Sequence, residues 1–113
     1  CLTKNERAPM TYENISPSEA KSRMDADPDA VVIDVRRPDE FVTGHIPGAL
    51  NVPLADIQDG NIPACMTDKN AVYLIYCRSG VRSVTAAVAL EKMGYTRLAN
   101  FGGILSWPYE IER

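Results

Sequence analysis

The sequence predicts an α/β fold, in which a central parallel sheet is flanked by helices on both faces. Two segments, residues 30–35 and 71–76, are almost continuously apolar and rich in β-branched or aromatic side chains, which is typical of strands buried on both faces. Segments with helical spacing alternate with these strands, and this order produces a parallel sheet. The chain has 113 residues, a length that favours one domain. We therefore expect one domain over residues 11–113, after a lead-in or linker at residues 1–10.

The first half of the chain contains one well-marked helix start. Ser16 can act as the N-cap, Pro17 suits the first turn, and Glu19 follows three residues after the cap. The helix should run to about Asp25, because the sequence Asp-Pro-Asp at residues 27–29 ends it. The other elements expected in this half are short strands at 12–15 and 49–52 and a polar connection at 36–48 with one helical turn near 39–42.

The second half contains the longest predicted helix. Residues 53–70 carry Pro, Gly and Asp breaks, so short helical turns and loops are expected there. The strand at 71–76 runs directly into residues 77–83, and a helix then continues to about Met93 and ends at Gly94. Two sets of residues with helical spacing are expected to face the core: Val81, Val84 and Val88, and Ala86, Leu90 and Met93. The last expected elements are a strand at 96–100 and a short helical tail that stops near Pro108.

The composition excludes several classes of function. Twelve Lys and Arg stand against fifteen Asp and Glu, a net charge of -3, so no basic surface for nucleic acid or anionic lipid is indicated. The longest apolar run, residues 71–77, has seven residues, far short of the roughly 20 needed to cross a membrane. We expect no transmembrane segment, no nucleic-acid partner and a monomeric protein.

The three cysteines, Cys1, Cys65 and Cys77, do not form a metal-binding or disulfide pattern. Their number is odd and no Cys-x-x-Cys or Cys/His spacing is present, so no metal site is expected. Cys1 is compatible with the lipid-bearing first residue of an exported lipoprotein or with a boundary inside a longer chain, and the compartment is either cytoplasmic or exported. Cys65 is expected to be an ordinary thiol rather than one that resolves an intermediate on Cys77.

Cys77 is the candidate nucleophile. In open parallel sheets, ligands bind beyond the carboxyl ends of the strands, and Cys77 follows the most apolar strand and precedes the longest predicted helix. A tight turn that contains Gly80 can aim several backbone N–H groups at one point, and these donors and the helix dipole favour an anion. A thiol placed there should have a pKa below the ordinary value of about 8.5.

The residues after Cys77 distinguish this hypothesis from an ordinary buried cysteine. Residues 78–83 include two arginines, a glycine and two serines, where a packed core would have apolar groups. Arg78 and Arg82 would lower the thiol pKa further and dock an anionic substrate. The candidate substrate-binding residues are Arg78, Ser79, Gly80, Val81, Arg82 and Ser83.

Other polar residues near this edge of the predicted sheet are assigned supporting or structural roles. Asp34 ends a buried strand and should accept hydrogen bonds from the loop or pair with an arginine. Arg36 and Arg37 should face the same edge, where they add positive potential and one of them joins a surface ion pair. His45 is expected to fix a turn by hydrogen bonding rather than to act as a general base, because an ionised thiol needs no base. The aromatic residues expected to pack in the core or at its rim are Phe101, Trp107 and Tyr109.

Several short motifs follow one another in a fixed order along the chain. They are Ile33–Arg36, Glu40-Phe41, Gly44–Ala49, Asn51, the loop Cys77–Ser83, Gly102-Gly103 and Trp107. This series resembles the motifs of the rhodanese family of sulfurtransferases over roughly residues 11–108, and residues 77–83 resemble the active-site loop of that family. The resemblance implies a single rhodanese-like domain.

The resemblance also implies a two-step sulfur transfer. The Cys77 thiolate attacks the outer sulfur of a donor such as thiosulfate and becomes a persulfide, and a thiol, cyanide or a protein sulfur carrier then accepts that sulfur. The N–H groups of residues 78–82 would stabilise the persulfide, while Arg78 and Arg82 would orient the anionic donor. No metal or organic cofactor is required by this scheme.

Two other functions stay open at this stage. A non-catalytic binding or sensing module could keep the fold and use the loop to hold a partner, a sulfur carrier or an anion. The intact Cys77, Gly80 and both loop arginines favour an enzyme. Cysteine-based phosphatases and the related arsenate reductases use a longer loop than the four residues between Cys77 and Arg82. The shorter loop favours a single sulfur atom over a tetrahedral oxyanion.

Overall fold

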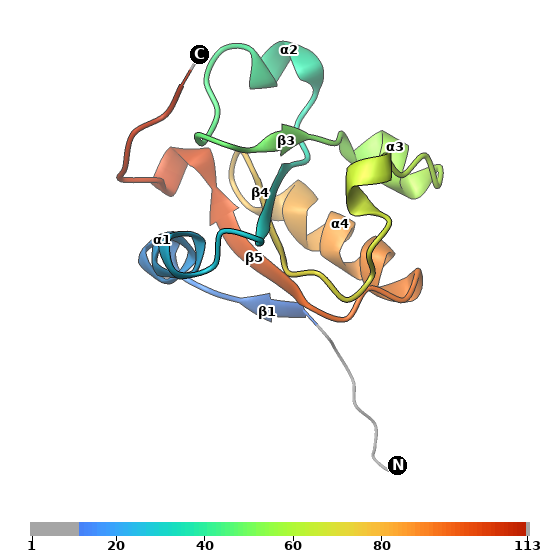
Figure 1. Cartoon of the computed structure of the whole chain (residues 1–113). Coiled ribbons are helices and arrows are strands. Elements are labelled where there is room, and N and C mark those ends of the chain that lie inside the picture. Colours follow the sequence, from blue (N-terminus) through green and yellow to red (C-terminus); the bar gives the residue numbers. More distant parts are fainter. Residues whose placement is uncertain (1–11, 113) are drawn as a thin grey trace.

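A computed structural model describes residues 12–112, so Cys1 and the expected lead-in at residues 1–10 lie outside the described residues. Within this range the chain forms a five-stranded sheet of order β1-β5-β4-β2-β3 (Figure 1). All neighbouring strands are parallel, which confirms the predicted α/β class. The strands are β1 (Tyr12–Asn14), β2 (Val31–Asp34), β3 (Leu50–Asn51), β4 (Tyr73–Cys77) and β5 (Leu98–Gly103).

Helices cover both faces of the sheet, as the sequence predicts (Figure 1). Ala20 of α1 is buried against one face together with Phe101 of β5. Ile57 of α3 and Leu90 of α4 are buried against the opposite face. The α-helices are α1 (Pro17–Ala26), α2 (Pro38–Phe41), α3 (Leu54–Gln58) and α4 (Val81–Lys92), and two 3-10 turns are η1 (Ala64–Met66) and η2 (Ile104–Ser106). Among the described residues, no helix is both long enough and apolar enough to span a membrane.

Alternation along β4 decides which face receives the candidate nucleophile. Tyr73, Ile75 and Cys77 point into the core cluster that includes residues of α3 and α4. Leu74 and Tyr76 point into the cluster on the α1 face, because successive side chains of a strand alternate between the two faces of its sheet. Cys77 therefore lies at the carboxyl end of β4 on the face covered by α4.

The start of α1 follows the predicted cap. Ser16 Oγ accepts a hydrogen bond from the Glu19 N–H at 3.1 Å, and Pro17 is the first helical residue. The serine satisfies one of the N–H groups that a helix leaves unpaired at its start. The helix ends at Ala26, within one residue of the predicted end.

The packing of α4 corrects one prediction. Val81 was expected to face the core with Val84 and Val88, but its side chain is 73% exposed, and the other two are half-buried. The fully buried residues of this helix are instead Ser83, Ala86, Ala87 and Leu90. Their spacing places them on the opposite side of the helix from Val81, and small residues there let the helix approach the sheet closely. The second predicted set is confirmed, since Met93 packs against the same core as Ala86 and Leu90.

β5 begins and ends later than predicted, at Leu98–Gly103 rather than at residues 96–100. Its second glycine pairs with Cys77, beyond a register shift in the ladder between β4 and β5. Because glycine has no side chain, the backbone of β5 can approach the backbone of the cysteine loop closely. The strand therefore continues up to the point where the loop begins. The end of β5 consequently forms one side of the site.

Candidate active site

The candidate site lies where three strands end at the same edge of the sheet. Cys77 is the last residue of β4, Asp34 is the last residue of β2, and Gly103 is the last residue of β5. Residues 78–80 connect Cys77 to α4, which begins at Val81. Parallel α/β sheets bind ligands at this edge, so the structure brings the predicted loop to the expected place.

The Cys77 sulfur is enclosed and hydrogen-bonded. The residue is 1% exposed, and the Gly80 N–H donates to Sγ at 2.9 Å. Burial raises the pKa of the thiol, but the N–H of Ser83, its nearby hydroxyl and the N–H groups of Gly80 and Ser79 lower it, and the net pKa of Cys77 is below the usual thiol value. Donors that converge on one atom stabilise its charged form. The loop therefore favours a thiolate.

Gly80 makes the turn that aims these N–H groups. Its φ angle is +105°, in the left-handed region that residues with a side chain rarely adopt. A Cβ atom at this position would also lie 3.3 Å from the Gly102 Cα. Both the backbone conformation and the close approach of β5 favour glycine at position 80.

The arginines of the site differ in whether an acidic side chain pairs with them. Arg82 makes a two-pronged pair with Glu40, at 2.7 and 3.0 Å. Arg37 pairs with Asp39 at 3.0 Å on the surface, which is the surface ion pair predicted for one of the two neighbouring arginines. Arg78 is exposed, and its side chain has no hydrogen bond or ion pair within residues 12–112. The available positive charge of the loop is therefore that of Arg78 rather than Arg82.

Arg36 corrects the expectation of an open positive charge at the sheet edge. Its side chain is 5% exposed and that of Asp34 is 0% exposed. Arg36 Nη2 donates to Asp34 Oδ2 at 2.8 Å and to the Gly44 carbonyl at 2.6 Å. The backbone N–H of Arg36 also donates to Asp34 Oδ1 at 2.9 Å, and this turn folds Arg36 back over the strand end. The predicted pairing of Asp34 with an arginine is confirmed, but both charges are internal.

Glu40 contacts a loop residue, but the sequence alone assigns it no role. Its carboxylate holds Arg82, which follows 42 positions later in the chain. The hydrogen bonds from Arg82 lower the pKa of Glu40 to about 2, although burial opposes them. The pair therefore stays ionised at neutral pH and fastens α2 to the start of α4. The helical turn predicted near 39–42 could have indicated a role for Glu40, because it places this acidic residue at the sheet edge that carries the loop.

His45 and the aromatic residues have the structural roles that the sequence predicts. His45 Nδ1 lies 3.1 Å from the Phe41 carbonyl oxygen, and the two rings stack with their centroids 3.8 Å apart. These contacts fix the turn after α2. Phe101 is buried in the core, and Trp107 packs against it with ring centroids 5.5 Å apart. Tyr109 lies at the rim and is 39% exposed.

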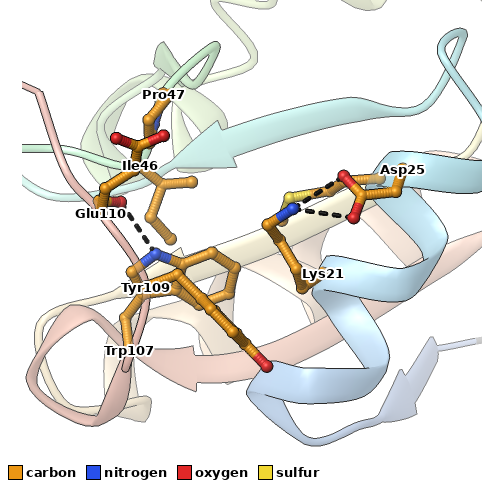
Figure 2. A pocket seen from close by; sticks show the side chains of 8 residues that line it. Lys21, Asp25, Ile46, Pro47, Trp107, Tyr109 and Glu110 are labelled. Carbon is orange, nitrogen blue, oxygen red and sulfur yellow. Dashed lines mark hydrogen bonds and ion pairs between the residues drawn. The ribbon is translucent and has the colours of Figure 1, made fainter.

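A separate cavity of about 190 Å³ lies beside α1. Figure 2 shows Trp107 and Tyr109 close to Lys21, whose ammonium group pairs with Asp25 at 2.7 Å. The indole N–H of Trp107 donates to the Glu110 carbonyl at 3.1 Å. Cys77 points to the opposite face of the sheet, so this cavity is not part of the candidate site.

Cys77 is a free, buried thiol. The side chain of Cys65, in η1, lies outside the described part of the chain, and the prediction for it stays a prediction. Across the part of the chain that the structure describes, there is no group of three or more His, Cys, Asp or Glu side chains that could hold a metal ion.

Comparison with known proteins identifies the family. The rhodanese-like domain model matches residues 16–109, a range that contains every residue of the site described above. The chain belongs to the rhodanese-like domain family. The family match covers 16–109, the range over which the structure forms its sheet from β2 to β5 with the flanking helices.

Relatives of this rhodanese-like domain include sulfurtransferases. The chain is 39% identical over 72 residues to the thiosulfate sulfurtransferase PspE of Escherichia coli, which covers 64% of this chain and 68% of the relative. It is 42% identical over 94 residues to a sulfurtransferase of Allochromatium vinosum, with 80% and 83% covered. A solved rhodanese-like domain protein from Staphylococcus aureus shares 31% identity with a TM-score of 0.75, over 88% of this chain and 96% of that chain. These similarities support sulfur transfer as the general class of activity.

The lowered pKa of Cys77 leads to a prediction about its reaction with iodoacetamide. Alkylation of Cys77, followed by mass spectrometry of the peptide that contains it, should reach half of its maximal rate at a lower pH in the folded protein than in urea. The reason is that the hydrogen bonds to the sulfur exist only in the folded state, whereas the unfolded thiol should titrate near about 8.5. Equal midpoints in the two conditions would contradict the prediction.

Proposed function

We propose that this rhodanese-like domain transfers the outer sulfur of thiosulfate, or of a related anionic donor, to a thiol or cyanide through a persulfide on Cys77. The observation that carries the proposal is the enclosed Cys77 sulfur, which accepts a hydrogen bond from the Gly80 N–H at 2.9 Å. The lowered pKa of this thiol increases the fraction of nucleophilic thiolate at neutral pH. Similarity to a thiosulfate sulfurtransferase supports the choice of donor.

In the first step, the Cys77 thiolate attacks the outer sulfur of thiosulfate. A new sulfur–sulfur bond forms, the sulfur–sulfur bond of thiosulfate breaks, and sulfite leaves with the electron pair. In the second step, the acceptor attacks the outer sulfur of the persulfide and Cys77 leaves as a thiolate. Cyanide becomes thiocyanate and a thiolate acceptor becomes a persulfide. Covalent catalysis of this kind divides one transfer into two easier steps.

The residues around the sulfur have different roles in this proposed reaction. The N–H groups of Ser79 and Gly80 stabilise negative charge on the sulfur before attack and on the persulfide afterwards. Arg78 is exposed at the rim, where its guanidinium group meets the anionic donor. Arg82 contributes indirectly, because its pair with Glu40 holds the start of α4 in place. A protein sulfur carrier would reach the same rim as a small acceptor.

The same geometry gives less support to phosphatase or arsenate reductase chemistry. A phosphate needs a guanidinium group that is free to bind its oxygens in pairs, and Arg82 already makes a two-pronged pair with Glu40. The loop between Cys77 and Arg82 is also short, with four residues. A non-catalytic binding module would share the observed geometry, and turnover is the property that separates it from an enzyme.

Formation of thiocyanate from thiosulfate and cyanide tests the proposed function. The wild-type protein should turn over repeatedly, whereas Cys77→Ser should lose activity to the background level because it has no sulfur nucleophile. Cys65→Ser is the matched control, since it removes a thiol elsewhere in the chain, and it should retain activity. An inactive wild-type protein that still binds thiosulfate would favour the binding module, and hydrolysis of an aryl phosphate would favour the phosphatase.

The different pairing of the two loop arginines predicts different effects on the use of thiosulfate. Arg78→Gln should raise the KM for thiosulfate about tenfold, because it removes an unpaired guanidinium group that would contact the donor. The double variant Glu40→Gln with Arg82→Gln removes one charge of each sign, so the net charge is unchanged and the KM should change by no more than about twofold. Steady-state kinetics at varied thiosulfate measures both. A larger KM in the double variant than in Arg78→Gln would show that Arg82 contacts the donor directly.

A further inference from the structure

A buried polar cluster lies behind the cysteine loop. It joins Ser83, the last residue of the loop motif, to Asn100, to which the sequence motifs and the proposed reaction assign no role. Ser83 of α4 is 0% exposed and Asn100 of β5 is 7% exposed. The neighbours of Asn100 in β5, Ala99 and Phe101, belong to the cluster on the α1 face. Alternation along the strand therefore turns Asn100 toward α4, on the same face of the sheet as Cys77.

The hydrogen bonds of Asn100 fix the orientation of its amide. The Gly102 N–H donates to Asn100 Oδ1 at 3.1 Å, and a backbone N–H can only donate, so the atom it contacts must be the amide oxygen. The amide nitrogen donates to Asn14 Oδ1 at 3.0 Å. Asn100 thus accepts hydrogen bonds through its amide oxygen on the side of the cysteine loop, and donates one through its amide nitrogen on the side of β1.

This orientation also assigns the proton of the Ser83 hydroxyl. Ser83 Oγ lies 2.6 Å from Asn100 Oδ1, and since that oxygen can only accept, Ser83 must donate its single hydroxyl proton to it. The Gly80 and Gly102 carbonyls lie farther from Ser83 Oγ, at 3.1 and 3.4 Å. The same hydroxyl is also one of the groups that lower the pKa of the Cys77 thiol. One proton cannot serve both acceptors, so the asparagine and the sulfur compete for it.

We propose that Asn100 is a positioning residue for the Cys77 loop, because its amide oxygen holds the Ser83 hydroxyl proton and keeps it from the sulfur. The proposal rests on the proposed function in that Cys77 is the reacting sulfur. While Asn100 holds the hydroxyl proton, the thiolate is stabilised mainly by backbone N–H groups and only weakly by the Ser83 hydroxyl. A sulfur that accepts fewer hydrogen bonds is less stabilised as the anion and is the stronger nucleophile when ionised.

The pH profile of Cys77 alkylation by iodoacetamide tests this role. Asn100→Leu keeps a similar side-chain volume but removes the acceptor, so the Ser83 hydroxyl should turn to the sulfur and lower the alkylation midpoint by about half a pH unit or more. The same substitution in a Ser83→Ala background should produce no such fall. Asn14→Ala is the matched control, because it removes only the outer hydrogen bond of Asn100 and should leave the midpoint where it is.

Ser83→Ala alone keeps the proposal testable if Asn100→Leu does not fold. The hydroxyl donates to Asn100 in the wild-type protein, so its removal should leave the Cys77 midpoint within about 0.2 pH unit. A clear rise of the midpoint in Ser83→Ala would overturn the proposal, because it would show that the hydroxyl already donates to the sulfur. A fall in Asn100→Leu that persists without the Ser83 hydroxyl would also overturn it. Alkylation needs no sulfur donor, so these outcomes are independent of the thiocyanate assay, which tests the proposed function.

Discussion

Gly103→Ala should destabilise the protein by about 3 kcal/mol and reduce thiocyanate formation about 100-fold, since a displacement of about 1 Å at a reacting group has an effect of this size. A Cβ atom at Gly103 would overlap the Arg78 carbonyl and lie 2.6 Å from the Ser79 Cα. Both contacts are with backbone atoms of the cysteine loop, which cannot rotate away as a side chain would. The added methyl group therefore has to push the loop away from the end of β5.

Urea unfolding and steady-state kinetics measure the two effects of Gly103→Ala. Gly103 has an extended backbone with φ -138°, so alanine is not excluded by backbone conformation and the effect is steric. Gly60→Ala is the matched control: a Cβ there meets no atom within 4 Å, but the φ angle is +81°, so the cost is backbone strain of about 1 kcal/mol. That control should keep its activity. Equal activity of the two variants would contradict the contact between β5 and the loop.

Asp34→Asn should lower the free energy of unfolding by about 3–5 kcal/mol, because it leaves the charge of Arg36 buried without a carboxylate. The Arg36 and Asp34 side chains are 5% and 0% exposed. The same change in an exposed pair should cost far less. Asp39→Asn supplies this comparison, since Arg37 and Asp39 are 68% and 69% exposed.

Chemical denaturation of Asp34→Asn and Asp39→Asn tests the difference between the buried and the exposed pair. Asp39→Asn should leave the midpoint of unfolding close to that of the wild-type protein, because the pair is exposed to solvent. The double variant Asp34→Leu with Arg36→Met should recover part of the stability lost in Asp34→Asn, because it removes both buried charges together. If Asp34→Asn costs no more than Asp39→Asn, then the Asp34–Arg36 pair does not support the sheet edge as described.

The elements that could be predicted from the sequence are those with a local signal. β2 and β4 are recognised from continuous β-branched and aromatic residues, and α1 from a side-chain cap whose hydrogen bond forms within three residues. The cysteine loop was located because a strand, a glycine turn and a helix start follow one another without interruption. The late end of β5 was not predicted, because Gly102 and Gly103 lower strand propensity while the pairing with β4 overrides it.

The parts of the site that escaped prediction depend on contacts between distant residues. Arg82 is paired with a carboxylate 42 positions earlier, and nothing local in the sequence shows that this arginine is occupied. Arg36 is buried because the chain turns back over the end of β2. Its charge alone would predict an exposed side chain. Asn100 has significance only through its contact with Ser83, a residue of the facing helix. In each case the sequence shows the residue type, but the packing of helices and strands determines which side chain it contacts.

The mass of the intact protein after incubation with thiosulfate tests the central claim most directly. We expect the gain of one sulfur atom on the peptide that contains Cys77. This sulfur should be lost on addition of cyanide and should be absent in Cys77→Ser. The enclosed sulfur and its bond from the Gly80 N–H should protect this persulfide in the folded protein. The absence of any added sulfur across the pH range, or its appearance on another cysteine while Cys77 stays unmodified, would contradict the account.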